Sequence, residues 1–144
     1  MSDHPFIFRS GIWEGGGKIC FSMAEDELDF VMRWTILPAE DSKIYFNQQI
    51  NIPELGQSMK NNFSLFEIRQ KNFSIELQNQ MVGKVCGKGV VDTNIIAWEF
   101  REPSQAFDGF EIYQLQGNLG YKMRAEFSAG EGLRTYVNGT ISPI

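Results

Sequence analysis

The run Leu28-Asp-Phe-Val-Met-Arg-Trp-Thr-Ile36 decides the fold, because its apolar residues recur at every second position. One face of the run carries Leu28, Phe30, Met32, Trp34 and Ile36, and the other carries Asp29, Arg33 and Thr35. Side chains alternate between the two faces of a β-strand, whereas an amphipathic helix repeats its apolar residues every three to four positions. The run therefore predicts a strand with one buried face.

Similar runs follow along most of the chain, separated by short polar or glycine-containing turns. The predicted strands span residues 18–23, 28–36, 43–52, 62–68, 72–77, 82–91, 95–101, 110–116, 121–127 and 133–141. Residues 53–62 are left open between a loop and a short helical turn. About ten strands joined by short sequential turns predict an all-β fold, an up-and-down antiparallel β-barrel. Closure removes exposed sheet edges, and a closed sheet of more than about eight strands tends to enclose a cavity.

The stretch Gly11-Ile-Trp-Glu-Gly-Gly-Gly-Lys18 precedes the first predicted strand. Its three consecutive glycines stand before a strand instead of a helix, and no Lys-Ser/Thr pair follows them, which excludes a phosphate-binding loop. We interpret them as a β-bulge or a sharp bend that allows the first strand to close the barrel.

The chain of 144 residues is long enough for one domain with its own core. We expect an N-terminal arm at residues 1–10, in which Phe6, Ile7 and Phe8 can pack across one end of the fold, and a single barrel domain at residues 11–144. The formal net charge is −5 and no basic stripe occurs, which argues against a nucleic-acid-binding protein. No stretch is long and apolar enough to predict a membrane-spanning helix.

The N-terminal residues lack the basic start and the apolar run of a signal peptide, so a cytoplasmic location is the expectation. In that compartment Cys20 and Cys86 are expected to be reduced and buried as small hydrophobic side chains. The single histidine, His4, falls in the arm, which we expect to be mobile. A nucleophilic triad needs a histidine base and zinc needs several closely spaced ligands. The sequence therefore assigns no catalytic residue, no metal and no cofactor.

The chain resembles the calycin group, which comprises the lipocalins, the fatty-acid-binding proteins and bacterial nitrobindin-like barrels. The resemblance rests on Gly11-Ile-Trp13, on the meander of short strands and on Arg134 in the last strand. It implies that Trp13 packs at the closed end of the barrel against Arg134. Arg134-Thr-Tyr136 matches the Arg-x-Tyr with which fatty-acid-binding proteins hold a ligand carboxylate. The proximal histidine of the nitrobindin-like haem barrels has no counterpart, and neither has the helical lid of the fatty-acid-binding proteins.

Arg134 and Tyr136 alternate with Leu133, Thr135 and Val137, and three interpretations stay open. If the Arg134 face points inward, the guanidinium and the phenol form a carboxylate clamp. If Arg134 covers Trp13, the contact is a structural cation–π interaction. If the face points outward, Arg134 is a solvated charge.

Other candidates lie in the middle of predicted strands. Arg124 and Arg33 are either solvated charges on the outer face or, in the case of Arg124, part of an inward cluster with Glu126 and Arg134. Aromatic side chains are expected inside the barrel, as packed core or as a ligand wall. The candidate ligand-binding residues are therefore Arg134, Tyr136, Arg124, Arg33, Trp34, Trp98 and Tyr113.

The sequence favours a binding protein for a small apolar ligand, with or without a carboxylate, inside a calycin-like barrel. A second hypothesis is a protein-interaction or assembly module with a filled barrel, which predicts a homodimer. A third is a barrel enzyme that uses Tyr, Arg and Glu. It requires Glu99, Glu111 or Glu126 to face inward near Tyr113 or Tyr136.

Overall fold

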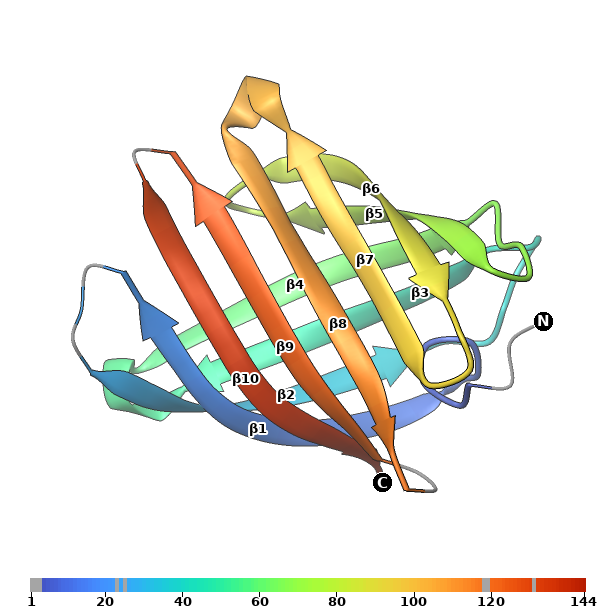
Figure 1. The fold of residues 1–144 in the computed structure, drawn as a ribbon, viewed down its shortest axis with the longest axis horizontal. Helices are drawn as coiled ribbons and strands as arrows, with labels where there is room; N and C mark the ends of the chain where they lie inside the picture. Colours follow the sequence, from blue (N-terminus) through green and yellow to red (C-terminus); the bar gives the residue numbers. More distant parts are fainter. Residues whose placement is uncertain (1–3, 23, 25, 118–119, 131) are drawn as a thin grey trace.

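The computed structural model describes residues 4–22, 24, 26–117, 120–130 and 132–144. Its ten antiparallel strands close into a barrel in which each strand pairs with its neighbours in the chain and β10 returns to pair with β1 (Figure 1). The strands are β1 (Gly11–Phe21), β2 (Glu27–Ile36), β3 (Ile44–Ile52), β4 (Gln57–Phe66), β5 (Asn72–Asn79), β6 (Gly83–Val91), β7 (Ile95–Glu102), β8 (Phe107–Gln116), β9 (Gly120–Ala129) and β10 (Leu133–Pro143). This confirms the predicted up-and-down antiparallel barrel.

The largest differences from the predicted bounds are at the starts of β1 and β4. Strand β1 begins at Gly11, so Trp13 lies within the strand and not ahead of it. In the region left open, residues 53–62, a single 3₁₀ turn at Pro53–Leu55 is followed by β4 from Gln57. The polar start of β4 hid this strand, because few apolar side chains mark its inner face. Residue 23 of the first predicted strand and residues 1–3 of the predicted arm lie outside the described residues.

The glycines of β1 lie in a sharply curved strand with unbroken register on both sides, so they form a bend and not a bulge. A Cβ on Gly15 would lie 1.9 Å from the carbonyl oxygen of Thr140, and one on Gly17 would lie 2.0 Å from that of Asn138. Only glycine permits this close approach of the β1 and β10 backbones.

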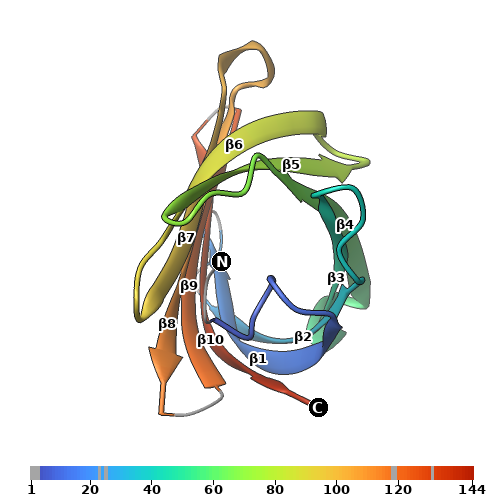
Figure 2. The same ribbon diagram turned by 90° about the vertical axis from the view of Figure 1, so that its right-hand side faces the viewer.

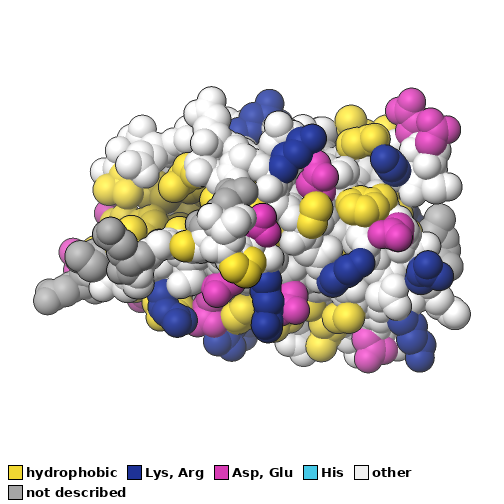
Figure 3. All heavy atoms as spheres, turned by 90° about the horizontal axis from the view of Figure 1, so that it is seen from above, with side chains coloured by type: hydrophobic (Ala, Val, Ile, Leu, Met, Phe, Trp, Pro, Cys, Tyr) yellow, Lys and Arg dark blue, Asp and Glu magenta, His cyan; other side chains and the backbone are white. Residues whose placement is uncertain are grey.

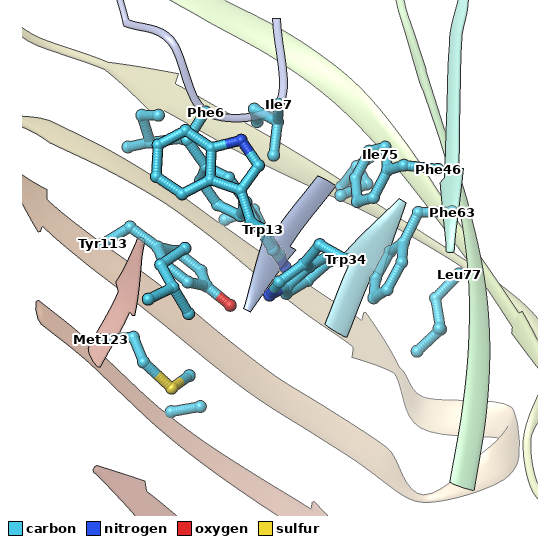
Figure 4. Packing of buried hydrophobic residues seen from close by; sticks show 14 of the residues in the cluster. Phe6, Ile7, Trp13, Trp34, Phe46, Phe63, Ile75, Leu77, Tyr113 and Met123 are labelled. Carbon is cyan, nitrogen blue, oxygen red and sulfur yellow. The ribbon is translucent and has the colours of Figure 1, made fainter. Parts of the chain in front are cut away.

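One end of the barrel is closed by residues 4–10, which run across it (Figure 2). Phe6 and Ile7 are fully buried there. The Phe6 ring lies 4.9 to 5.5 Å, between centroids, from the rings of four aromatic residues, Trp13, Trp34, Tyr113 and Tyr121. Figure 4 shows Phe6 beside Trp13, Trp34 and Tyr113. These contacts place a densely packed aromatic core at this end.

His4 is buried as well, so the expectation of a mobile arm is wrong for this residue. Its Nε2 lies 2.6 Å from the carbonyl oxygen of Asp92, and its Nδ1 lies 2.7 Å from the hydroxyl of Tyr121. A carbonyl oxygen can only accept, so Nε2 carries the proton of that bond. The two bonds fasten the N-terminal segment to the β6–β7 turn and to β9.

The outer surface carries acidic and basic side chains interspersed, without a continuous field of one sign on the face seen in Figure 3. Cys20 is partly exposed and Cys86 is exposed, and both are free, so the expectation that they are buried is wrong. They lie on β1 and β6, at outward positions of the pleat. Among the described residues, no helix is long and apolar enough to cross a membrane.

Candidate functional site

The interior of the other end of the barrel, which we call the open end, holds a cavity of about 200 Å³. The turns β1–β2, β3–β4, β5–β6, β7–β8 and β9–β10 surround this end. Most of the cavity wall is apolar. The wall residues are Ile19, Phe21, Phe30, Met32, Ile50, Met59, Phe63, Leu77, Met81, Val82, Phe107, Met123, Ala125, Phe127, Ala129, Thr135 and Val137, together with the polar Gln48, Asn61, Asn79 and Glu111.

Glu111 is the only ionisable side chain among the described residues that line this cavity, and it is 3% exposed. Its carboxyl accepts two hydrogen bonds from side chains behind it. Trp98 Nε1 donates to Oε2 at 2.9 Å, and the Tyr113 hydroxyl donates to Oε1 at 2.7 Å. Neither donor lines the cavity, so both act on the site by holding the carboxyl of Glu111 in place.

Burial raises the pKa of Glu111 from 4.5 to about 7. Removing the carboxylate from water disfavours its charged form, and the hydrogen bonds from Tyr113 and Trp98 offset only part of this effect. Burial and the neighbouring Glu111 also raise the pKa of the Tyr113 phenol well above its ordinary value, so Tyr113 remains a hydrogen-bond donor. Near neutral pH the Glu111 carboxyl is therefore divided between its charged and neutral forms.

Across the cavity, three amide side chains form a chain of hydrogen bonds. Asn79 Nδ2 donates to Asn61 Oδ1 at 2.9 Å, and Asn61 Nδ2 donates to Gln48 Oε1 at 2.8 Å. The chain ends at Gln48 Nε2, which makes a weak contact of 3.7 Å with the sulfur of Met32. Because Gln48 is 4% exposed and lines the cavity, its amide N–H groups are donors for a bound molecule.

Gln48 and Glu111 come from opposite walls of the barrel. Gln48 lies on β3 and Glu111 on β8. Four strands separate them on one side, β4 to β7, and four on the other, β9, β10, β1 and β2. A molecule that fills the cavity therefore lies between a carboxyl group and an amide donor.

The backbone pairing of β4 with β5 stops short of the open end, which leaves a notch in the barrel wall. The β4–β5 ladder begins at Asn62 and Gln78, so residues 57–61 of β4 extend beyond the described pairs of that ladder. An outer groove of about 820 Å³ follows this edge and shares Ile50, Met59, Asn79 and Met81 with the cavity wall. The Asn79–Asn61 hydrogen bond spans the notch where backbone pairing stops.

Asn79 also organises the turn that borders the notch. Its Oδ1 accepts hydrogen bonds from the backbone N–H groups of Met81 and Val82, both at 2.9 Å. One side chain thus holds the β5–β6 turn in shape and fastens it to β4.

The structure places Arg134 and Tyr136 on the outer side of β10. Arg134 is exposed and Tyr136 is half-buried, while the alternate residues Thr135 and Val137 line the cavity. Of the three interpretations left open by the sequence, this geometry fits the solvated charge. The β1–β10 ladder pairs Trp13 with Pro143, so Trp13 and Arg134 lie at opposite ends of the barrel and do not meet.

Arg33 and Arg124 also point outward. Arg33 forms an exposed ion pair with Glu14, in which its Nε lies 2.9 Å from Glu14 Oε2. Arg124 lies 3.7 Å from Glu126 and stacks over the Phe110 ring at 5.8 Å on the barrel exterior. The sequence left open an inward cluster of Arg124, Glu126 and Arg134. This cluster does not form, because the strands direct these side chains to the outside of the barrel.

The three aromatic candidates face inward, but they lie beneath the cavity and not on its wall. Trp34 is fully buried in the closed-end core, and its Nε1 has no hydrogen-bond partner among the described residues. Trp98 and Tyr113 stack with ring centroids 5.1 Å apart and meet at the carboxyl of Glu111. The Trp34 ring lies 6.3 Å from the Trp98 ring and 6.0 Å from the Tyr113 ring, between centroids, so the structure brings these three of the seven candidates together.

Sequence reasoning did not select Gln48, Asn61 or Asn79, and it named Glu111 only in the enzyme hypothesis. A signal for Gln48 was present, since it interrupts an otherwise apolar face of the third predicted strand. Asn61 and Asn79 fell at predicted loop or turn positions and carried no such signal. The geometric condition of the enzyme hypothesis, an inward Glu beside Tyr113, is met by Glu111, whereas Glu99 is exposed.

Among the described residues, no group of three or more His, Cys, Asp or Glu side chains is placed to hold a metal ion. The polar side chains that line the cavity are three amides, the carboxyl of Glu111 and Thr135, and all of them can form hydrogen bonds with an organic molecule.

No family model and no curated protein matches the chain. Two solved structures are similar to this chain in fold. The S-type phycobiliprotein lyase CPES from Guillardia theta aligns with a TM-score of 0.70 over 94% of this chain and 88% of its own, at 9% identity. Rv2717c from M. tuberculosis aligns with a TM-score of 0.71 over 94% of this chain and 92% of its own, at 13% identity. These similarities confirm the calycin-like barrel, and at such identities they show the fold alone.

Proposed function

We propose that this barrel binds a small, mostly apolar molecule in the open-end cavity and holds its polar groups against Glu111 and Gln48. The observation that carries the proposal is the position of Glu111, an ionisable side chain at the bottom of an apolar cavity. Burying a carboxyl costs free energy, and the two donors behind it hold it in one orientation. Few convergent polar groups in an apolar cavity are typical of a small-molecule site.

The size of the cavity restricts the ligand. A volume of about 200 Å³ is below the roughly 300–1,000 Å³ of pockets for drug-sized ligands. An apolar cavity of about 150 Å³ can bind benzene. The proposed ligand therefore has one or two rings or an aliphatic body of similar size.

The charge of the site restricts the ligand further. No Lys, Arg or His lines the cavity among the described residues, so a ligand carboxylate would meet Glu111 without a counter-ion. We therefore propose a neutral ligand in place of the carboxylate-bearing ligand that the sequence left open. It carries a hydrogen-bond donor for Glu111 or an acceptor for Gln48.

Access to the cavity through the notch between β4 and the β5–β6 turn is part of the proposal. The outer groove and the cavity have four wall residues in common, among them Met59 and Met81. Methionine side chains are flexible and apolar, and they can move aside at low cost. The hydrogen bond between Asn61 and Asn79 would have to open or shift for a ring to pass.

The test uses 2-naphthol, a neutral fluorescent probe with two rings and one hydroxyl. We expect saturable binding at a ratio of one to one, measured by fluorescence titration and native mass spectrometry. Ala125→Leu fills the cavity from β9 and should abolish binding. Ala97→Leu adds the same atoms at an outward position of β7 and is the matched control.

Because Ala125→Leu can fail to fold, Val137→Phe fills the cavity from β10 as a second variant. Circular dichroism of both variants establishes that the barrel is intact. If the wild-type protein shows no saturable binding, or if both folded cavity variants bind as well as the wild type, the proposal fails.

The hypothesis of an assembly module with a filled barrel has less support, because the open end is hollow. A homodimer and a cytoplasmic location stay predictions from the sequence.

A further inference from the structure

We propose that Glu111 transfers a proton to and from carbon in a small ketone bound in the open-end cavity, so that the barrel catalyses a shift of a double bond along its substrate. This activity rests on the proposed binding function and adds a reaction to it. The substrate class is a neutral, mostly apolar ketone with an acidic C–H next to its carbonyl group.

The first requirement is a base with a free acceptor site at the cavity. Each Glu111 oxygen accepts one described side-chain hydrogen bond, from Trp98 or from Tyr113. A carboxylate has about four acceptor positions, so positions remain for a proton from the substrate. Both donors come from the side away from the cavity, which leaves the carboxyl fixed and facing the bound molecule. Trp98 and Tyr113 are positioning residues in this scheme.

The second requirement is a donor where negative charge develops. Removal of a proton next to a carbonyl places charge on the carbonyl oxygen, and a fixed N–H group stabilises it. Gln48 Nε2 faces the cavity from the opposite wall, where it makes only a weak contact with the Met32 sulfur among the described residues. The hydrogen bonds from Asn79 through Asn61 hold the amide of Gln48 with its oxygen occupied and its N–H groups available.

The reaction balances without an added oxidant, reductant or cofactor. The Glu111 carboxylate takes the proton from the carbon between the carbonyl and the double bond, and the electron pair of that C–H bond passes into the enolate. The enolate oxygen accepts a hydrogen bond from Gln48. Glu111 then returns the proton to the far carbon of the former double bond, which gives the conjugated ketone and restores the carboxylate.

The protonation state of Glu111 suits this task. A pKa of about 7 makes the carboxylate a stronger base than an ordinary one, while a large fraction stays ionised near neutral pH. Ordinary exposed carboxylates are ionised as well, but they are weaker bases and are solvated by water.

The test uses cyclohex-3-enone, which is converted to cyclohex-2-enone by this proton shift and is followed by ultraviolet absorbance. Displacement of 2-naphthol establishes that the ketone occupies the cavity. We expect an acceleration of at least about 100-fold over buffer, a typical size for a positioned base. The rate should rise with pH as Glu111 ionises, with the midpoint of the rise near pH 7.

Glu111→Gln should lose the acceleration and keep the binding of 2-naphthol within about twofold, since a glutamine can pair with Trp98 and with the Tyr113 hydroxyl. Glu99→Gln, an exposed carboxyl on the neighbouring strand β7, is the matched control and should leave the rate unchanged. Gln48→Leu should lower the rate while the pH profile keeps its midpoint.

Two results would overturn the activity. One is a bound ketone that is isomerised no faster than in buffer, and the other is a Glu111→Gln variant as fast as the wild type. In both cases binding of 2-naphthol would still hold, so the proposed binding function would survive. Loss of 2-naphthol binding in the wild type would instead remove the proposed function itself.

Discussion

The two ends of this barrel are built from the same ten strands and differ in how their interiors are filled. At the closed end, Phe6 and Trp13 pack with other aromatic rings, and the N-terminal segment covers them. At the open end, a cavity of about 200 Å³ remains, and its wall includes an ionisable side chain and three amides. One end is therefore filled by packed aromatic side chains, and the other keeps a cavity into which polar side chains face.

The difference shows in which polar groups are buried and what they do. His4 at the closed end joins the N-terminal segment to Tyr121 and to the Asp92 carbonyl, so its polar atoms serve the structure. Glu111 and Gln48 at the open end face the cavity. Buried polar groups without a structural task are candidates for function, because their burial is otherwise only a cost.

The largest expected effect is at the closed end. Phe6→Ala removes a fully buried ring that contacts four aromatic rings, and it should lower the free energy of unfolding by about 3–5 kcal/mol. Chemical denaturation measures this loss.

Phe127→Ala is the matched change at the open end. Phe127 stacks on Phe107 but is half-buried at the cavity rim, so its loss should cost only about 1 kcal/mol. Equal losses for Phe6 and Phe127 would contradict the division between a packed and a hollow end.

The next largest effect is the dependence of the free energy of unfolding on pH, to which Glu111 contributes. Its pKa is about 7 in the folded protein against 4.5 ordinarily, so the unfolded chain ionises first as the pH rises. The contribution of Glu111 to the free energy of unfolding is therefore largest below about pH 4.5. It falls as the pH rises from there and levels off above about pH 7. The expected total is about 3 kcal/mol, since a pKa difference of one between the folded and unfolded chain corresponds to roughly 1.4 kcal/mol.

Glu111→Gln should remove the fall in the free energy of unfolding that the ionisation of Glu111 causes. The variant should therefore be more stable than the wild type at about pH 8 and no more stable at about pH 4. Urea denaturation at both pH values gives the difference between the two proteins, in which the other carboxyl groups cancel. An identical pH dependence in both proteins would mean that Glu111 is solvated in the folded state.

The fold was predictable from the sequence because alternation in β2 needs no knowledge of the partner strands. The inward position of Glu111 was not. Strand β8 has apolar residues on both faces, with Phe110 and Ile112 outside and Tyr113 inside, so alternation alone does not say which face is buried. Barrel closure and the register with β7 and β9 decide it.

The N-terminal segment and Arg134 differ in how far the sequence alone could place them. Phe6 and Ile7 lie in no strand, so only their apolar character supported the expectation that they pack across one end of the fold, which the structure confirms. For Arg134, alternation placed the side chain on the face opposite Thr135 and Val137 but left open which of the two faces points inward. The register of β10 with β1 and β9 directs Arg134 outward, so the carboxylate clamp and the contact with Trp13 that the resemblance implied do not form.

A smaller effect is expected at the notch. Asn79→Ala removes the hydrogen bond to Asn61 and the cap on the β5–β6 turn, at a cost of about 1–2 kcal/mol. Amide hydrogen exchange should rise at Met81 and Val82, and 2-naphthol should associate and dissociate faster. Asn138→Ala, at an exposed position on the outer face of β10 and outside the groove, is the control and should change neither. Faster exchange without faster binding would place access to the cavity elsewhere.

The smallest effect is expected for Arg134→Ala, which tests whether the outer side of the open end takes part in binding. The Arg134 side chain is exposed, and its backbone N–H, which donates to Ser22 Oγ at 3.0 Å, survives the substitution. Stability should change by less than about 0.5 kcal/mol, and the affinity for 2-naphthol by less than about twofold, because Thr135 and Val137 face the cavity instead. A tenfold loss of affinity would require β10 to present Arg134 to the ligand, and the outward register of this strand would then be wrong.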